Sequence, residues 1–267
     1  MLYMKLKGKR VVITGASSGL GKALLKQMLH AGARIIGVAR HIEPIIEEFG
    51  ARGVQALACD VSQPAEVDTM LTKATDLLGG IDVFVANAGF AYFGTIGKAD
   101  WEKTERIFRT NVISPIYTLQ KLTENGRTEP LTFMITVSAL GKMVLPGYSL
   151  YDSTKFALDG FVRTYRMERP KNVRIIPVYP VANFTDFFRK AGGDDTPMPL
   201  LARQLPQITA FCMKEGIRLG VRSVYPSIIF IIRCLLVRVT PADLLVQWVE
   251  RPRFYLWRKR HNDLPHS

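Results

Sequence analysis

The stretch Thr14-Gly15-Ala16-Ser17-Ser18-Gly19-Leu20-Gly21 decides the fold that this sequence predicts. It continues a predicted strand at 10–14, which is mostly β-branched, and opens a helical pattern at 20–31, so it joins a strand to a helix. Its first glycine permits a tight turn, its second lets a ligand approach the backbone, and its third allows the helix to pack closely. In this setting the stretch predicts the first unit of a parallel α/β sheet.

Strand and helix patterns continue to alternate after this turn. We expect strands at 34–38, 54–59, 83–86, 131–137 and 173–179, and helices at 64–78, 101–123 and 150–168. This alternation is typical of parallel strands joined by crossover helices. The sequence therefore predicts a doubly wound, Rossmann-type parallel sheet with helices on both faces.

The chain is divided by a change of pattern in its last third. Its 267 residues suffice for one large α/β domain followed by an extension. After Pro180 the alternation loosens, and the stretch 191–199, with its glycines and prolines, is typical of a mobile loop. We assign residues 1–202 to the α/β domain and residues 203–267 to a helical extension that packs on the domain, lies at a membrane interface, or does both.

Composition excludes several classes of protein. Hydrophobic residues make up 48% of the chain and charged residues 22%, which excludes a disordered chain, a collagen and a coiled coil. Cys59, Cys212 and Cys234 are too few and too scattered for a disulfide framework or a zinc cluster, so we expect no metal site and a reducing compartment, the cytoplasm. The basic residues at the start have no apolar segment behind them, so we expect no secretory signal.

Positive charge is concentrated near the C-terminus. The net charge is +13, and residues 203–267 hold 11 Lys or Arg against 4 Asp or Glu. Such a segment favours a polyanionic surface, either acidic phospholipid or nucleic acid, with a solvated basic face as the alternative. Because no nucleic-acid recognition module is present and a long apolar run precedes the basic end, we expect contact with an anionic membrane and no nucleic-acid partner.

The apolar run lies at 224–239, where 12 of 16 residues are hydrophobic. Arg233 and Arg238 interrupt it, so it falls short of the ~20 residues that a membrane-spanning helix needs. It either lies in a membrane interface or packs on the domain as a closing helix. Thr240 and Pro241 then predict the start of another helix, and the stretch 251–260 interleaves aromatic and basic residues as interfacial segments do.

The glycine turn predicts a dinucleotide site, because the amides at a helix N-terminus bind a pyrophosphate. An acidic residue at the end of the second strand would select a ribose 2′-hydroxyl, but Arg40 stands there, so we expect NADP(H) in preference to NAD(H). Asp60 and Val61 are candidate adenine contacts, and Asp60 is alternatively a helix cap. The cofactor-binding candidates at the turn are Gly15, Ser17, Ser18, Gly19, Leu20 and Gly21.

Tyr151 and Lys155 lie four residues apart, so both face the same side of a helix. Ser138 ends the strand upstream of them, and Asn111 lies in the preceding helix. A phenol has an ordinary pKa of ~10, and a nearby ammonium favours its ionised form. Tyr151 is therefore a candidate general acid and base, and Ser138 a candidate donor to a developing oxyanion.

These motifs, together with Asn87-Ala88-Gly89, resemble those of the short-chain dehydrogenase/reductase family in their order along residues 7–185. The resemblance implies a sheet of about seven strands and hydride exchange between a nicotinamide and a carbonyl or alcohol carbon. It implies that Asn87, Ala88 and Gly89 contact the cofactor and that Asn111 helps to hold a water relay to Lys155. It also implies a homodimer or homotetramer built on the helices that contain Asn111 and Tyr151.

The sequence departs from the family after the sixth strand. Such sequences usually show Pro-Gly and then a Thr that contacts the nicotinamide, whereas here Pro180 is followed by Val181, with Thr185 as the candidate Thr. A β-branched residue does not easily adopt a positive φ, so either the turn differs or the cofactor is displaced. This departure supports one alternative, a dinucleotide-binding sensor or scaffold with little turnover.

Apolar residues surround the predicted substrate side. The segments after Ser138 and Pro180 and beside Asn87 hold Ala139, Leu140, Met143, Val144, Leu145, Tyr148, Phe184, Phe187, Phe188, Phe90 and Tyr92. Such a lining favours a hydrophobic carbonyl compound over a sugar or a small acid. With the apolar, basic C-terminus it predicts a lipid-like or steroid-like substrate met at a membrane surface.

Overall fold

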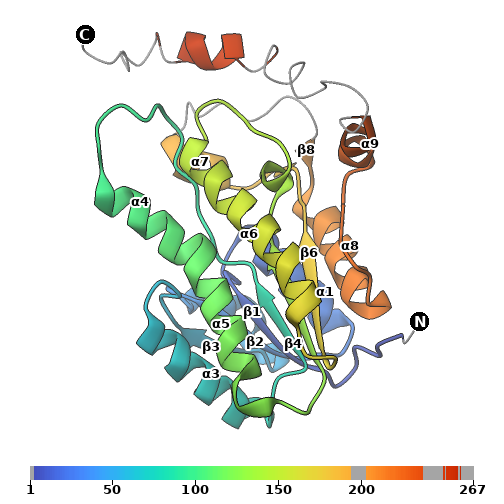
Figure 1. Ribbon diagram of the computed structural model, residues 1–267. Coiled ribbons are helices and arrows are strands. Elements are labelled where there is room, and N and C mark those ends of the chain that lie inside the picture. The colour runs from blue at the N-terminus through green and yellow to red at the C-terminus, as the bar shows by residue number, and fades with distance from the viewer. Residues whose placement is uncertain (1–2, 194–202, 237–248, 250, 258, 260–267) are drawn as a thin grey trace.

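The computed structural model describes residues 3–193, 203–236, 249, 251–257 and 259 (Figure 1). One sheet of six parallel strands forms its centre, in the order β3-β2-β1-β4-β5-β6. The strands are β1 (Arg10–Thr14), β2 (Arg34–Ala39), β3 (Gln55–Ala58), β4 (Val83–Ala86), β5 (Leu131–Thr136) and β6 (Val173–Val178). Because the strand order reverses between β1 and β4, a crevice is expected above their carboxyl ends.

Helices cover both faces of the sheet, and each face has its own hydrophobic core. One core joins the strands to α1 (Gly19–His30), α2 (Glu43–Phe49) and α8 (Pro206–Leu219). The other joins them to α3 (Pro64–Leu78), α5 (Ser114–Thr123) and α6 (Ser149–Glu168). A central strand of such a sheet is buried on both faces, so its successive residues are apolar. In β1 these residues are Val11, Val12 and Ile13. The expected doubly wound fold is therefore confirmed.

Two details differ from the expected pattern. The sheet has six strands instead of about seven, because the chain beyond β6 pairs with it only through a parallel bridge between Val178 and Val224. The helix expected at 101–123 is divided into α4 (Trp101–Phe108), a π-helical turn (Arg109–Ile113) and α5. A π-turn of this kind is common at functional sites.

The C-terminal part of the chain contributes to the domain core. Helix α8 packs on α1 through Ala210, Met213 and Ile217, which are fully buried. It is followed by the short helix α9 (Ile228–Leu236). Within the described residues no helix is long and apolar enough to cross a membrane. The predicted helix start at Thr240, residues 194–199 of the predicted loop and the boundary at residue 202 lie outside the described residues, so the division into two parts stays a prediction.

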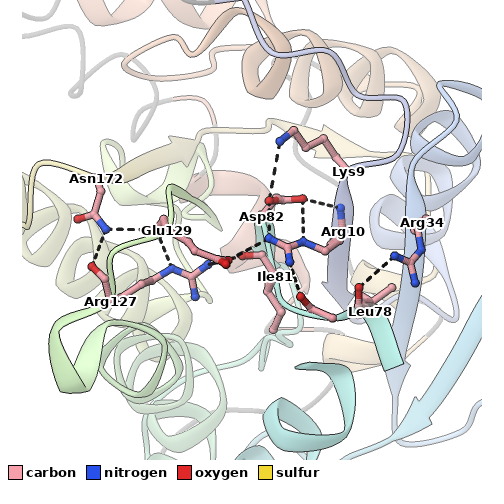
Figure 2. Close-up of polar contacts among 10 residues, drawn as sticks. Lys9, Arg10, Arg34, Leu78, Ile81, Asp82, Arg127, Glu129 and Asn172 are labelled. Atoms are coloured by element: carbon pink, nitrogen blue, oxygen red, sulfur yellow. Dashed lines mark hydrogen bonds and ion pairs between the residues drawn. The ribbon is translucent and has the colours of Figure 1, made fainter. Parts of the chain in front are cut away.

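A polar network closes the amino-terminal edge of the sheet (Figure 2). Arg10 donates to both carboxylate oxygens of Asp82, at 2.9 and 3.1 Å, and to Glu129 at 3.0 Å. Burial alone would raise the pKa of Asp82, but the hydrogen bonds and charge of Arg10 and the charge of Lys9 hold it below its ordinary value. The network joins the starts of β1 and β4 at the edge opposite the crevice.

Candidate active site

A cavity of about 1410 Å³ lies at the carboxyl ends of the strands. It brings together most of the residues that the sequence singled out: Gly15, Ser17, Ser18, Gly19, Leu20, Arg40, Asp60, Val61, Asn87, Ala88, Gly89, Ser138, Tyr151, Lys155, Pro180 and Thr185. Gly21 and Asn111 are outside its lining. Segments that are far apart in the sequence therefore share one site at the predicted crevice.

The glycine turn forms a cradle of backbone at one end of this cavity. Gly15 adopts φ +67°, and a Cβ atom there would lie 3.0 Å from the Cα atom of Ala88. A Cβ atom on Gly21 would lie 2.1 Å from the carbonyl oxygen of Gly15, so Gly21 serves close packing. The hydroxyl of Ser18 does not cap α1, and the first turn of α1 has no acidic residue. The turn thus suits the phosphates of a dinucleotide.

Thr14 and Asn87 join the ends of β1 and β4 beneath this cradle. The Thr14 hydroxyl accepts hydrogen bonds from the backbone N–H groups of Asn87 and Ala88, at 3.0 and 3.1 Å. The Asn87 amide donates to the carbonyl oxygen of Thr14 at 3.1 Å, and its oxygen accepts from the hydroxyl of Thr136 at 3.2 Å. Asn87-Ala88-Gly89 is therefore held rigidly along the cavity floor.

The two predicted adenine-side residues differ in their partners. Arg40 is exposed at the end of β2, and among the described residues no carboxylate pairs with it. The carboxylate of Asp60 accepts from the N–H and the hydroxyl of Ser62, at 3.0 and 2.8 Å. Since the N-cap of α3 is Gln63, Asp60 orders the turn before α3 and does not cap the helix directly.

Tyr151 and Lys155 both face the cavity from α6, as the four-residue spacing predicts. The Lys155 Nζ atom lies 5.3 Å from the centroid of the Tyr151 ring and donates to the carbonyl oxygen of Thr136 at 2.9 Å. Only 7% of Tyr151 and 4% of Lys155 are exposed. Both side chains are thus held in fixed positions in a largely dry environment.

Burial controls the pKa values of this pair in the protein alone. It raises the pKa of Tyr151 above its ordinary value, and a hydrogen bond with Ser138 opposes that rise. It lowers the pKa of Lys155 to about 7. Burial therefore dominates the pKa of Tyr151 here, and the acidifying effect expected from Lys155 requires Lys155 to carry its proton.

Ser138 is the one described residue other than glycine with a positive φ, at +95°. Its hydroxyl accepts from the N–H of Leu140 at 3.2 Å, and its own N–H donates to the carbonyl oxygen of Val178 at 3.1 Å. Such a conformation costs about 1–3 kcal/mol and is found mainly at functional sites. Ser138 and Tyr151 both line the cavity.

Asn111 lies in the π-helical turn, behind the cavity wall. Its side chain accepts from the N–H of Phe90 at 3.1 Å and donates to the carbonyl oxygen of Phe90 at 2.8 Å. It also donates to the Thr154 hydroxyl at 3.1 Å. Asn111 therefore fixes the loop after β4 against the helix that carries Tyr151 and Lys155.

The turn after β6 accommodates Val181 without strain, because among the described residues only glycines and Ser138 have a positive φ. The carbonyl oxygen of Pro180 accepts from the N–H of Ala139 at 2.8 Å, which ties this turn to the Ser138 segment. The Cγ2 atom of Thr185 would lie 3.5 Å from a Cβ atom on Gly19. Thr185 thus lies beside the glycine turn.

Aromatic side chains line the other end of the cavity. The Phe187 ring lies 5.5 Å from the Tyr151 ring, and the Phe90 and Tyr92 rings lie 5.2 Å apart. Two residues expected here are not in the lining: Val144 is 40% exposed and Tyr148 is buried behind the wall.

Sequence reasoning missed two features of this end. Phe254 and Trp257, in the described part of the C-terminal segment, pack on Phe93 with ring centroids at 5.8 and 4.6 Å. Arg106 lines the cavity from α4. The contact of Phe254 and Trp257 with Phe93 joins segments that are distant in the sequence, so no local pattern predicts it. Arg106 is a single arginine on an amphipathic helix, and the sequence does not distinguish it from a side chain that faces solvent.

Known proteins resemble this chain in sequence and in fold. The family model for short chain dehydrogenases matches residues 9–195. A 3-ketodihydrosphingosine reductase of Bos taurus is 30% identical over 226 residues, which are 80% of this chain and 67% of that protein. A short-chain type dehydrogenase/reductase from Mycobacterium marinum has a TM-score of 0.74 and 28% identity over 83% of this chain and 94% of its own. An alcohol dehydrogenase from Thermococcus sibiricus, complexed with 5-hydroxy-NADP, has a TM-score of 0.70 and 26% identity over 82% of this chain and 95% of its own.

Proposed function

Because the chain belongs to the short-chain dehydrogenase family and is an oxidoreductase that uses a nicotinamide dinucleotide, we propose that it interconverts a carbonyl and an alcohol on a hydrophobic, lipid-like substrate with NADP(H). One observation carries the proposal. A single cavity joins the glycine turn to Ser138, Tyr151 and Lys155.

The preference for NADP(H) rests on Arg40. Its guanidinium lies at the end of β2 on the cavity wall, and no carboxylate among the described residues neutralises it. A planar guanidinium binds a phosphate through paired hydrogen bonds, whereas an acidic residue at this place would repel a 2′-phosphate. NAD(H) would lack the group that Arg40 binds.

Each candidate catalytic residue has its own role in the transfer of the proton. When bound, the nicotinamide supplies or accepts the hydride. Tyr151 then gives a proton to the carbonyl oxygen in reduction, or takes it from the alcohol in oxidation. Ser138 donates a hydrogen bond to the same oxygen, and the ammonium of Lys155 stabilises the phenolate of Tyr151. Asn111 acts as a positioning residue through Phe90 and Thr154.

A lipid-like substrate is favoured by the apolar end of the cavity. Leu140, Met143, Leu145, Phe187 and Phe188 line it. A relative that is 30% identical over 80% of this chain is named a 3-ketodihydrosphingosine reductase. A sugar or a small hydroxy acid would leave these side chains without apolar contacts.

Helix α9 supports peripheral contact with an anionic membrane, as part of the same proposal. Phe230 is buried, whereas Ile228, Ile229 and Ile232 are 75%, 63% and 52% exposed. The residues from 203 onward carry a net charge of +7, since they hold 11 basic and 4 acidic side chains. An exposed apolar face beside an excess of cations is typical of an interfacial helix.

We also propose a homodimer or homotetramer built on the helices that contain Asn111 and Tyr151. Ile113, two residues after Asn111, is 55% exposed, and Phe156, on the Tyr151 helix, is 44% exposed. Self-association would cover these side chains, and light scattering on the purified protein tests it. The alternative, a dinucleotide-binding sensor or scaffold with little turnover, rests on Val181, which adopts a φ that is not positive.

The test of the proposed function is NADPH consumption with a panel of carbonyl compounds. Long-chain and steroid-like ketones are compared with a keto sugar and a small keto acid, and Tyr151→Phe serves as the control without the proton donor. We expect turnover with the lipophilic ketones only, lost by a factor of about 100 or more in Tyr151→Phe. Turnover that survives in Tyr151→Phe would contradict the assignment.

A further inference from the structure

Arg106 is a cation at the substrate end of the cavity that the proposed chemistry does not use. It belongs to α4 and lines the cavity beside Phe90 and Tyr92. Its Nε atom donates to the Tyr92 hydroxyl at 2.9 Å, and its guanidinium carbon lies 5.7 Å from the Tyr92 ring centroid and 5.9 Å from that of Phe90. These contacts hold the guanidinium against the aromatic wall while the side chain stays exposed.

The charge of Arg106 is not neutralised by an acidic side chain. Within the part of the chain that the structure describes, Arg106 makes no ion pair, and its neighbour Glu105 pairs with Arg109 at 2.9 Å. Asp186, the acid that lines this side of the cavity, pairs with Arg189 at 3.2 Å. Tyr92 engages only the Nε atom of the Arg106 guanidinium, so both of its terminal nitrogens are available to a ligand.

A second cation lies on the same side. Lys190 lines the cavity from α7 (Phe187–Gly192) and, in the described residues, has no ion-pair partner. The next residue, Ala191, accepts a hydrogen bond from the N–H of Phe93 at 2.9 Å, so the end of α7 is held against the loop that carries Tyr92. Two uncompensated cations therefore lie at the substrate end, around aromatic side chains.

The position of Arg106 separates it from the reacting groups. It precedes Asn111 by five residues, in α4, whereas Asn111 lies in the π-helical turn that follows. Asn111 contacts Thr154, the residue before Lys155. A group bound by Arg106 would thus lie several atoms from the carbonyl that Tyr151 and Ser138 hold.

We infer that the substrate is an anionic amphiphile, whose carboxylate or phosphate is bound by Arg106 with help from Lys190 while its apolar part occupies the aromatic end of the cavity. The inference rests on the proposed function and specifies its substrate. Planar guanidinium groups bind such oxyanions through paired, charge-assisted hydrogen bonds. An ammonium headgroup at the same place would be repelled, so a substrate of the sphingoid-base type is disfavoured.

The test compares three ketones that have the same carbon chain and differ in their head group: an oxo-fatty acid, its primary amide and the corresponding amine. Their binding to the protein in saturating NADPH is measured by calorimetry, and their turnover by NADPH consumption. We expect the oxo acid to bind about tenfold or more tightly than the amide, and the amine to bind most weakly. Equal binding of the acid and the amide would overturn the inference.

Matched variants separate this role from general damage to the site. Arg106→Ala is expected to lose about tenfold in affinity for the oxo acid and little for the amide, with NADPH binding unchanged, and Arg106→Lys should restore part of the loss. Arg109→Ala, at the residue that follows α4 and outside the cavity lining, should change neither. Equal losses for acid and amide would overturn the inference. If no ketone is turned over, the proposed function fails, while binding of the oxo acid that depends on Arg106 still supports the anion site.

Discussion

Lys155 donates a hydrogen bond from Nζ to the carbonyl oxygen of Thr136 at 2.9 Å. Thr136 ends β5, two residues before Ser138, whereas Lys155 lies one turn after Tyr151 in α6. The bond therefore ties the helix that carries the phenol to the strand end that positions the serine. Burial of Lys155 lowers its pKa to about 7, so this contact involves an amine that titrates close to neutral pH.

Two substitutions of Ser138 distinguish the effect of backbone strain on stability from the effect of the hydroxyl on catalysis. Ser138→Gly and Ser138→Ala both lose the hydrogen bond from the N–H of Leu140, but only Ser138→Gly relieves the cost of the φ of +95°. We expect Ser138→Gly to exceed Ser138→Ala by about 1 kcal/mol in free energy of unfolding, measured by urea denaturation. Both should lose about 100-fold in kcat, because neither donates to the substrate oxygen. Equal stability of the two variants would show that the backbone is not strained there.

Asp152 makes stability depend on pH. Its carboxylate accepts from the N–H of Leu145 at 2.9 Å, but its Oδ1 atom has no partner among the described residues. Burial raises its pKa to about 8, which the hydrogen bond from Leu145 only partly opposes. An unfolded Asp has a pKa of about 3.9, so between these values the folded protein holds a proton that the unfolded chain has lost. The contribution of this group to the free energy of unfolding therefore falls as pH rises, by up to about 1.4 kcal/mol per pH unit.

The neutral isostere tests this sign. Asp152→Asn keeps an acceptor for Leu145 and removes the titration, so its Tm should exceed that of the wild type by an amount that grows from about pH 5 to pH 8. Differential scanning calorimetry at several pH values measures the difference. A constant difference between the two proteins would rule out titration of Asp152 in this range.

Asp159 joins three segments around the site. Its carboxylate accepts from Lys142 at 2.8 Å, from the Tyr179 hydroxyl at 2.6 Å and from Arg163 at 2.8 Å, and the carboxylate side chain is 7% exposed. Lys142 follows the Ser138 segment and Tyr179 precedes Pro180. Asp159→Asn should lower the free energy of unfolding by about 2–3 kcal/mol, because two buried contacts lose their charged acceptor.

The exposed partner of Asp159 provides the control. The Arg163 side chain is 64% exposed, so Arg163→Ala should cost less than about 1 kcal/mol. Urea denaturation measures both variants, and NADPH consumption shows whether the loss of Asp159 also disturbs the site. Similar costs for Asp159→Asn and Arg163→Ala would mean that the contacts with Lys142 and Tyr179 are not important for stability.

The exposed face of α9 predicts binding to anionic vesicles. Replacing Ile229 and Ile232 together by Glu should abolish sedimentation with vesicles that contain phosphatidylserine, since it removes apolar area and adds repulsive charge. Ile96→Glu changes an equally exposed isoleucine in the loop before α4 and should have no effect. Unaltered sedimentation of the double variant would exclude α9 as the membrane contact.

Local patterns predict most of the sheet and the motif residues at its carboxyl edge. The helix 64–78 has the expected bounds, because Pro64 starts it and Gly79 ends it in the left-handed conformation. Local sequence does not predict the π-helical turn at Asn111, since this turn depends on hydrogen bonds with Phe90. The positive φ of Ser138 likewise depends on its bond to Val178. Arg106 acquires its role only through Tyr92, fourteen residues away.

The central claim is tested most directly by comparing NADPH and NADH binding, measured by cofactor fluorescence, in the wild type, Arg40→Ala and the exposed control Arg52→Ala. We expect NADPH to bind more tightly than NADH, and Arg40→Ala to weaken NADPH binding by about tenfold while leaving NADH binding and the Arg52→Ala protein nearly unchanged. Binding of neither cofactor, or an equal effect of Arg40→Ala on both, would contradict an NADP(H)-dependent oxidoreductase.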